Sequence, residues 1–143
     1  MTRRAALVFL LCANMGAVAQ TRDALIVPGE RVGPIALGLS EADLVMAAGA
    51  PASTLRQGNQ TIYAFGRVSA QISQSGVDLI TVDDPRFETA DHLRLGLALP
   101  VAISLLGQPA KRTTTNGVET LEYEGMALIV RSNLVVQIRV QRK

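Results

Sequence analysis

The chain has few of the residues on which most metal, redox and nucleic-acid sites depend. Its 143 residues include one Cys, one His and no Trp, and aromatic residues make up 3%. A structural zinc cluster needs several Cys or His ligands and a disulfide needs two cysteines, so neither is expected. The scarcity of aromatic side chains also argues against a base-stacking platform for nucleic acid. The hydrophobic fraction of 48% is that of a folded protein, and the length suits one domain or two very small ones.

Residues 1–19 have the pattern of a secretory signal peptide. Arg3 and Arg4 precede a short apolar stretch, residues 5–13, and Ala17-Val18-Ala19 is a small-x-small cleavage site before Gln20. The apolar stretch is shorter than the ~20 residues of a transmembrane helix. We therefore expect export by a bacterium and cleavage near Ala19-Gln20, with no transmembrane span. Periplasm and extracellular space both remain open.

Removal of this segment changes both the charge and the cysteine count. The full chain carries 14 Lys and Arg residues against 12 Asp and Glu, a formal net charge of +2. Without Arg3 and Arg4 the two numbers are equal at 12, and the single cysteine, Cys12, is lost as well. The mature chain then has neither a disulfide nor a thiol nucleophile. It also lacks the excess positive charge that would favour nucleic acid or an anionic membrane as partner.

Short motifs recur at an interval of 58 residues, which predicts an internal duplication. Leu37-Gly38-Leu39 returns as Leu95-Gly96-Leu97, and Gly49-Ala50-Pro51 returns as Gly107-Gln108-Pro109. The apolar positions of one later stretch recur in the same way: Val77, Ile80 and Val82, then Val135, Ile138 and Val140. We expect repeat 1 in residues 20–84 and repeat 2 in residues 85–143, folded as one compact unit. Chance recurrence of Gly, Pro and aliphatic residues is the alternative.

Each repeat predicts a short helix followed by an antiparallel meander. Ser40 is a candidate N-cap of a helix that stops at Gly49, and Pro100 suits the first turn of a helix that stops at Gly107. The strands expected are 31–37, 60–65, 68–73, 77–82, 112–115, 118–123, 126–131 and 134–140. The predicted fold class is α+β, with two tandem helix-plus-meander repeats and both helices packed on one face of the sheet. One continuous sheet and two separate sheets are both compatible with the sequence.

Alternation along the strands assigns side chains to faces. Leu134, Val136, Ile138 and Val140 alternate with Val135, Gln137 and Arg139, which predicts a half-buried last strand with one wetter face. Tyr63 and Phe65 are two residues apart and share a face, while Tyr123 is nearly equivalent in the second repeat. Tyrosine serves interfaces because one end is apolar and the other polar. The candidate contacts for a partner are Tyr63, Phe65, Tyr123 and Arg139, and core packing is the alternative for the aromatics.

The order of these motifs resembles a small domain of the bacterial envelope. The resemblance is carried by Leu37-Gly38-Leu39-Ser40 with Gly49-Ala50-Pro51, and by Leu95-Gly96-Leu97 with Gly107-Gln108-Pro109. Over most of residues 31–140 the pattern is similar to the outer-membrane-assembly lipoprotein domain of the SmpA/OmlA type and to the β-lactamase inhibitor protein, itself a tandem repeat. The resemblance implies an exported adaptor, inhibitor or ligand-binding protein that presents a sheet face. The chain departs from these families because it has no convincing lipidated cysteine and no mature disulfide.

Residues 83–92 offer a different kind of site. They include Asp83, Asp84, Asp91 and the single histidine, His92. Carboxylates and imidazole ligate metal ions, so a small metal-dependent hydrolase or metal-binding protein centred here is the alternative function. The spacing matches no EF-hand, His-Glu-x-x-His helix or zinc pair. A solvated linker between the repeats, with Phe87 packed on the core, is the simpler interpretation.

The sequence contains no nucleophile elbow, phosphate loop or dinucleotide fingerprint. We therefore expect a non-enzymatic protein without a cofactor, which binds an envelope protein or a small ligand through its sheet face or the groove between repeats. The partner's identity and the oligomeric state are not indicated.

Overall fold

The computed structural model describes residues 24–143, so the expected signal peptide lies outside the described residues. The fold is α+β, with helices α2 (Glu41–Ala48) and α3 (Leu99–Leu106) and two sheets. The smaller sheet contains β1 (Leu25–Val27), β2 (Arg31–Val32), β3 (Ile35–Ala36) and β8 (Glu88–Thr89). The larger sheet contains β4 (Ser53–Gln57), β5 (Gln60–Phe65), β6 (Val68–Ser73), β7 (Gly76–Val82), β9 (Lys111–Thr115), β10 (Val118–Tyr123), β11 (Met126–Arg131) and β12 (Leu134–Gln141).

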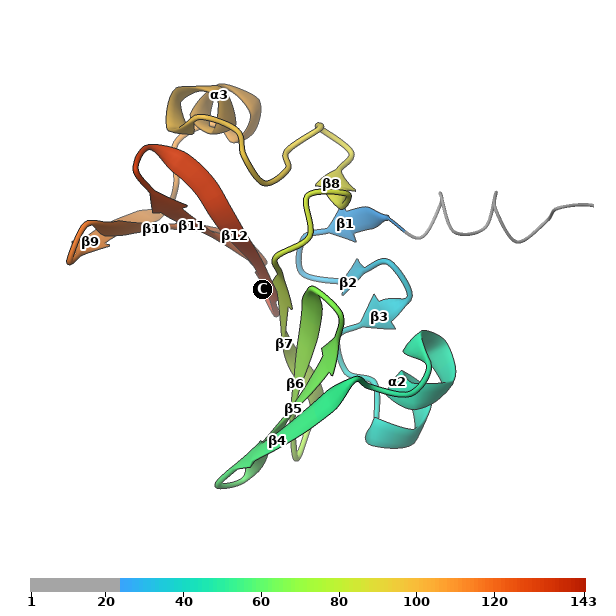
Figure 1. Cartoon of the computed structure of the whole chain (residues 1–143). Coiled ribbons are helices and arrows are strands. Elements are labelled where there is room, and N and C mark those ends of the chain that lie inside the picture. The colour runs from blue at the N-terminus through green and yellow to red at the C-terminus, as the bar shows by residue number, and fades with distance from the viewer. Residues whose placement is uncertain (1–23) are drawn as a thin grey trace, which may run out of the picture.

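The larger sheet is continuous across both halves of the chain. Its order is β4-β5-β6-β7-β12-β11-β10-β9, so two four-stranded meanders join through their last strands. β7 and β12 run antiparallel, with Ile80 opposite Val140 and Val82 opposite Ile138. In Figure 1 the meanders form two arms that meet at this pair. The choice between one sheet and two, which the sequence leaves open, is thereby decided.

Both helices begin and end where the sequence predicts. The Ser40 hydroxyl accepts a hydrogen bond from the Asp43 amide at 3.2 Å at the start of α2, and Pro100 lies in the first turn of α3. Gly49 and Gly107 end the helices with positive φ angles of 84° and 80°, which a side chain would oppose. Helices of eight residues are too short to be stable alone, so both depend on packing. Within residues 24–143 there is no helix with the length and apolar character needed to cross a bilayer.

The strand predictions differ from the structure in several places. The strands β1, β4 and β8 have no counterpart among the expected ones. In β4 all five residues are exposed and show no apolar alternation. The strand expected over 31–37 is instead the hairpin of β2 and β3. Gly33 adopts a φ of 53° and Pro34 follows it, which closes a turn and interrupts the extended chain.

The predicted alternation in β12 is also wrong, because the strand contains a β-bulge. The register against β11 shifts between Ile129 and Val130, which leaves Val136 as the extra residue. One extra residue reverses the face of every side chain that follows it. Val135 is therefore buried together with Ile138 and Val140, while Leu134 and Val136 are exposed. β7 has the corresponding bulge at Asp78, whose Oδ1 is enclosed without a hydrogen-bond partner among the described residues.

The core lies against one face of the larger sheet. One row across this face consists of Tyr63, Ala70, Ile80, Val140, Met126 and Tyr123. The same apolar cluster includes Leu44 of α2, Leu99 of α3, and Ile26 and Val32 of the smaller sheet. A single core therefore connects both meanders, both helices and the smaller sheet.

Gly76 is confined by the loop that leads into α2. A Cβ on Gly76 would lie 2.6 Å from the Gly38 carbonyl oxygen and 2.8 Å from that of Leu39. We expect Gly76→Ala to lower the free energy of unfolding by about 3 kcal/mol, because backbone on both sides must move. Gly58→Ala is the control, since φ is 58° there and nothing lies within 4 Å of the new methyl group. Urea unfolding should show that Gly58→Ala lowers the free energy of unfolding by only about 1 kcal/mol. An equal loss of unfolding free energy in the two variants would contradict the prediction.

Candidate functional site

The face of the larger sheet opposite the core carries few charges on the first meander. Pairing register places two rows of side chains there: Ser53, Ala64, Ser69 and Thr81, then Leu55, Ile62, Gln71 and Leu79. Every member of both rows is uncharged. Depletion of charge is the compositional signal of the centre of a protein interface. We call these rows and their continuation on the second meander the open face.

On the second meander the open face continues through Arg139, Ala127, Glu122 and Lys111. Ala127 and the neighbouring Ile129 are only 5% and 9% exposed, although they point away from the core. Arg139 is exposed and lies opposite Thr81, at the junction of the meanders. A cation in this position can contact any partner that covers both halves of the face.

A chain of hydrogen bonds holds Arg139 in place. Its Nε donates to Gln137 Oε1 at 3.0 Å, and Gln137 Nε2 donates to Asp83 Oδ1 at 3.0 Å. Asp83 follows β7, so this chain crosses from one meander to the other. The guanidinium is therefore oriented by a neighbour rather than free in solvent.

The three aromatic candidates lie on the other side, among the core residues. Tyr63 is 5% exposed, and a hydrogen bond with Glu41 is the main reason that its pKa is raised above the ordinary value. The Tyr123 hydroxyl donates to the Gly107 carbonyl oxygen at 2.9 Å, and burial raises the pKa of Tyr123. Phe65 packs against the core. These side chains tie the helices to the sheet, and the structure does not bring them together with Arg139.

The segment 83–92 separates its four candidate ligands. Asp84 is 3% exposed and accepts hydrogen bonds from Arg86, with Nη2 at 2.7 Å from Oδ2 and the backbone N–H at 3.0 Å from Oδ1. Asp83 faces Gln137, and His92 Nδ1 lies 3.5 Å from Glu88 Oε1. Within residues 24–143, no three His, Cys, Asp or Glu side chains are close enough to hold a metal ion. Phe87 packs on the core, as a linker predicts, but Asp84 is buried rather than solvated.

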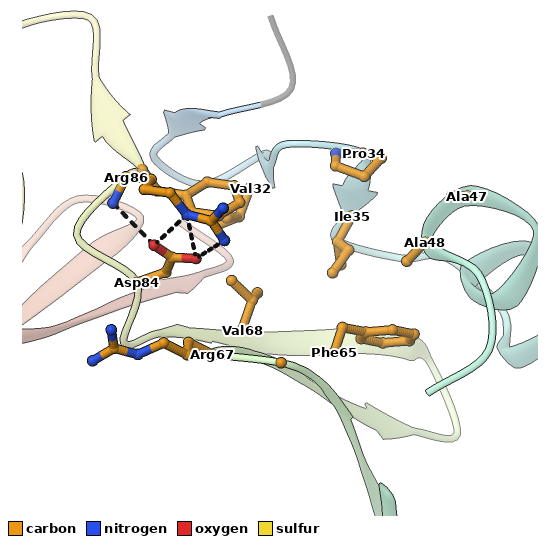
Figure 2. A pocket seen from close by; sticks show the side chains of 12 residues that line it. Val32, Pro34, Ile35, Ala47, Ala48, Phe65, Arg67, Val68, Asp84 and Arg86 are labelled. Atoms are coloured by element: carbon orange, nitrogen blue, oxygen red, sulfur yellow. Dashed lines mark hydrogen bonds and ion pairs between the residues drawn. The ribbon is translucent and has the colours of Figure 1, made fainter. Parts of the chain in front are cut away.

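A hollow of about 320 Å³ lies beside this segment, between α2 and the β5–β6 turn (Figure 2). Its walls are mostly apolar: Val32, Pro34, Ile35, Ala47, Ala48, Phe65, Gly66, Val68 and Phe87, with Arg67, Asp84 and Arg86 as polar members. The sequence patterns do not predict this site. The spacing Asp84-Pro85-Arg86 is a signal for a local carboxylate–guanidinium pair, but the apolar walls come from segments far apart in the chain.

Comparison with known proteins identifies similar folds only. No family model matches the chain, and no curated protein does. Among solved structures, the chain is similar to a DUF4309-family protein from Bacillus subtilis, with a TM-score of 0.57 and 15% identity over 80% of this chain and 88% of that one. A cysteine-rich secretory protein from Staphylococcus aureus has a TM-score of 0.56 and 14% identity over 81% of this chain and 47% of that one. An extracellular protein with an SCP domain from Bacillus anthracis has a TM-score of 0.53 and 9% identity over 75% and 44%.

These likenesses show a fold that occurs in secreted and extracellular bacterial proteins. The chain spans less than half the length of the two proteins from Staphylococcus and Bacillus anthracis. A Streptococcus mutans protein assigned provisionally to the β-lactamase inhibitors also matches, but a TM-score of 0.31 carries no argument. The SmpA/OmlA part of the resemblance stays a prediction.

The Asp84–Arg86 pair predicts a specific response to acid. Hydrogen bonding to Arg86 is the main reason that the pKa of Asp84 lies below its ordinary value. A depressed folded-state pKa stabilises the fold above the unfolded pKa, and this contribution is lost as pH falls through the folded pKa. We expect Arg86→Gln to lower the melting temperature at pH 7 and to reduce the further loss between pH 4 and pH 2, because the buried carboxylate loses its partner.

The matched control is Arg112→Gln, since Arg112 Nη2 lies 2.7 Å from Glu119 Oε2 in an ion pair whose carboxylate is more exposed than that of Asp84. Exposed pairs contribute about 0–1 kcal/mol, so the control should melt close to the wild type. Melting curves by circular dichroism from pH 2 to pH 7 measure both variants. Identical pH profiles for the two variants would count against a role of Arg86 in holding Asp84.

Proposed function

We propose that this chain is an exported, non-enzymatic binding protein of the bacterial envelope that recognises a protein partner through its open face. The observation that carries the proposal is the face itself: two adjacent rows without charge, continued by Ala127 and Arg139 across the meander junction. Interfaces are depleted in charge at their centre and use arginine as an anchor. Arg139 is the proposed central contact.

The arrangement of the helices supports this proposal. Leu44 of α2 and Leu99 of α3 join the same core cluster as the inward row of the sheet. Both helices and the smaller sheet lie on the same side of the two arms in Figure 1. We infer that they cover one face together and that no element within residues 24–143 covers the other. The aromatic candidates Tyr63, Phe65 and Tyr123 then serve the fold, and the open face serves the partner.

An internal duplication is part of the proposal, with repeat 1 in residues 20–84 and repeat 2 in residues 85–143. Its main support is one contact made twice. The Gly38 amide donates to the Val77 carbonyl at 2.8 Å, and the Gly96 amide donates to that of Val135 at 2.8 Å. In return, Val77 and Val135 each donate to the second Leu of the Leu-Gly-Leu motif at 2.9 Å. The corresponding bulges in β7 and β12 agree with this origin.

Export is supported by the sequence and by the fold. The signal pattern of residues 1–19 would direct the chain out of the cytoplasm, and its removal leaves a cysteine-free chain of balanced charge. The solved structures of similar fold include extracellular and secretory proteins. We propose the periplasm or the extracellular space as the place of action.

Thr81→Arg tests the open face, because Thr81 is half-buried and lies at its centre beside Arg139. The mature chain is immobilised and used to capture proteins from an envelope extract, and the enriched protein is then titrated. We expect the variant to bind it at least about tenfold more weakly, since a second guanidinium beside Arg139 must be desolvated, and tenfold corresponds to about 1.4 kcal/mol.

Ser104→Arg is the matched control, because Ser104 is exposed on α3 and the same charge is added. It should retain wild-type affinity, and urea unfolding should show both variants folded. Equal loss in both variants would place the interface elsewhere. Failure to enrich any protein in repeated captures would argue against the proposed function as a whole.

A further inference from the structure

The two meanders end in hairpins that have different surroundings. In the second meander the carbonyl oxygen of Gly125 accepts hydrogen bonds from the amides of Gln141 at 3.1 Å and Gly29 at 2.9 Å. A Cβ on Gly125 would lie 2.6 Å from Gly29, so the turn between β1 and β2 packs directly on this hairpin. This end of the sheet is therefore closed by the chain itself.

The hairpin of the first meander has no such cover. The Arg67 carbonyl oxygen accepts from the Asp83 amide at 2.8 Å, which corresponds to the bond from Gln141. Among residues 24–143, no second backbone amide donates to the Arg67 carbonyl oxygen as that of Gly29 does to the Gly125 carbonyl oxygen. Nothing lies within 4 Å of the Cβ position of Gly66, the other residue of this turn. The hollow of about 320 Å³ occupies this end of the sheet.

The hollow is apolar along most of its wall and positive at one end. Val32, Ile35 and Phe65 surround its apolar part, as Figure 2 shows. At the other end Arg86 uses Nε and Nη2 to bind Asp84, and its side chain is 83% exposed. Arg67 is close enough to act on the charge of Asp84. Arg67 also lines the hollow, with its side chain extending away from Phe65 in Figure 2, so two positively charged residues and one carboxylate lie at this end, while Asp83 hydrogen-bonds with Gln137 on the opposite face.

We propose that this hollow binds a small amphiphilic carboxylate, with an aliphatic chain against Val32, Ile35 and Phe65 and its carboxylate at the end formed by Arg86 and Arg67. Small-molecule sites are concave and mostly apolar with a few polar groups that fix orientation, and their volumes begin near ~300 Å³. A carboxylate supplies the charge that Asp84 leaves uncompensated. The site lies on the core side of the sheet, so it does not depend on the partner proposed for the open face.

Sodium octanoate is the probe, titrated into the mature chain by isothermal calorimetry, with octylammonium chloride as the ligand of opposite charge. We expect one octanoate per chain and binding of octylammonium at least about tenfold weaker. Ala48→Leu places a larger side chain in the hollow and should weaken octanoate about tenfold or more, whereas Ala42→Leu on the exposed side of α2 should not. Arg67→Gln should weaken octanoate severalfold, and Arg131→Gln, an exposed arginine away from the hollow, should leave it unchanged.

Three results would overturn the proposal: no octanoate heat at millimolar concentration, equal affinity for octylammonium, or unchanged affinity in Arg67→Gln. Circular dichroism checks that Ala48→Leu is folded, and Arg67→Gln supplies an independent test because the Arg67 side chain makes no ion pair with another residue among 24–143. If octanoate did not bind and a peptide bound the hollow instead, the site would be a protein contact and not a carboxylate site. None of these results bears on capture of a partner by the open face.

Discussion

The pairing of β7 with β12 is the contact on which the rest of the structure depends. Four residues of each strand are in register, and Ile80, Val82, Ile138 and Val140 from this pair are fully buried. Half of a chain of this size buries too little apolar surface to be stable alone, so the two meanders need a shared core. Joining the last strand of each meander also places β4 and β9 at the two outer edges of the sheet.

This pairing makes the molecule two-sided. One face collects the apolar side chains of both meanders, and residues of both helices join the same core cluster. Neither helix is long enough to be stable without such packing. The other face is left with uncharged residues on the first meander and with Arg139 at the centre. A partner bound there would meet the sheet directly. The proposed carboxylate site lies behind the sheet, so both ligands can be accommodated at once.

The two halves differ most where one is closed and the other open. Gly125 has the turn of Pro28 and Gly29 packed against it, whereas Gly66 has free space and two arginines nearby. The same contrast appears at the aromatic positions. The Tyr123 hydroxyl donates a hydrogen bond to Gly107 at the end of α3, whereas Phe65 has no polar atom that could form such a bond with α2. The two hairpins therefore have different surroundings: a hollow lies beside the first, and the turn of Pro28 and Gly29 packs against the second.

The sequence by itself determined the helices, their caps and most of the strands, because these signals act over a few residues. Each helix starts or ends at residues whose own backbone and hydrogen-bonding properties favour that position: Ser40 and Gly49 for α2, Pro100 and Gly107 for α3. It also determined the α+β class, and it offered Arg139 as a candidate contact. Strand β4 could not be predicted, since an edge strand exposed along its whole length has no apolar alternation.

Only the tertiary structure decided how these elements meet. The bulge at Val136 reversed the face of part of β12 because register depends on the partner strand. The walls of the hollow, from Val32 to Phe87, bring together segments that lie far apart in the chain, and Asp84 is buried beside them. Contacts of this kind arise from packing and not from local preference, so no reading of neighbouring residues could have located them.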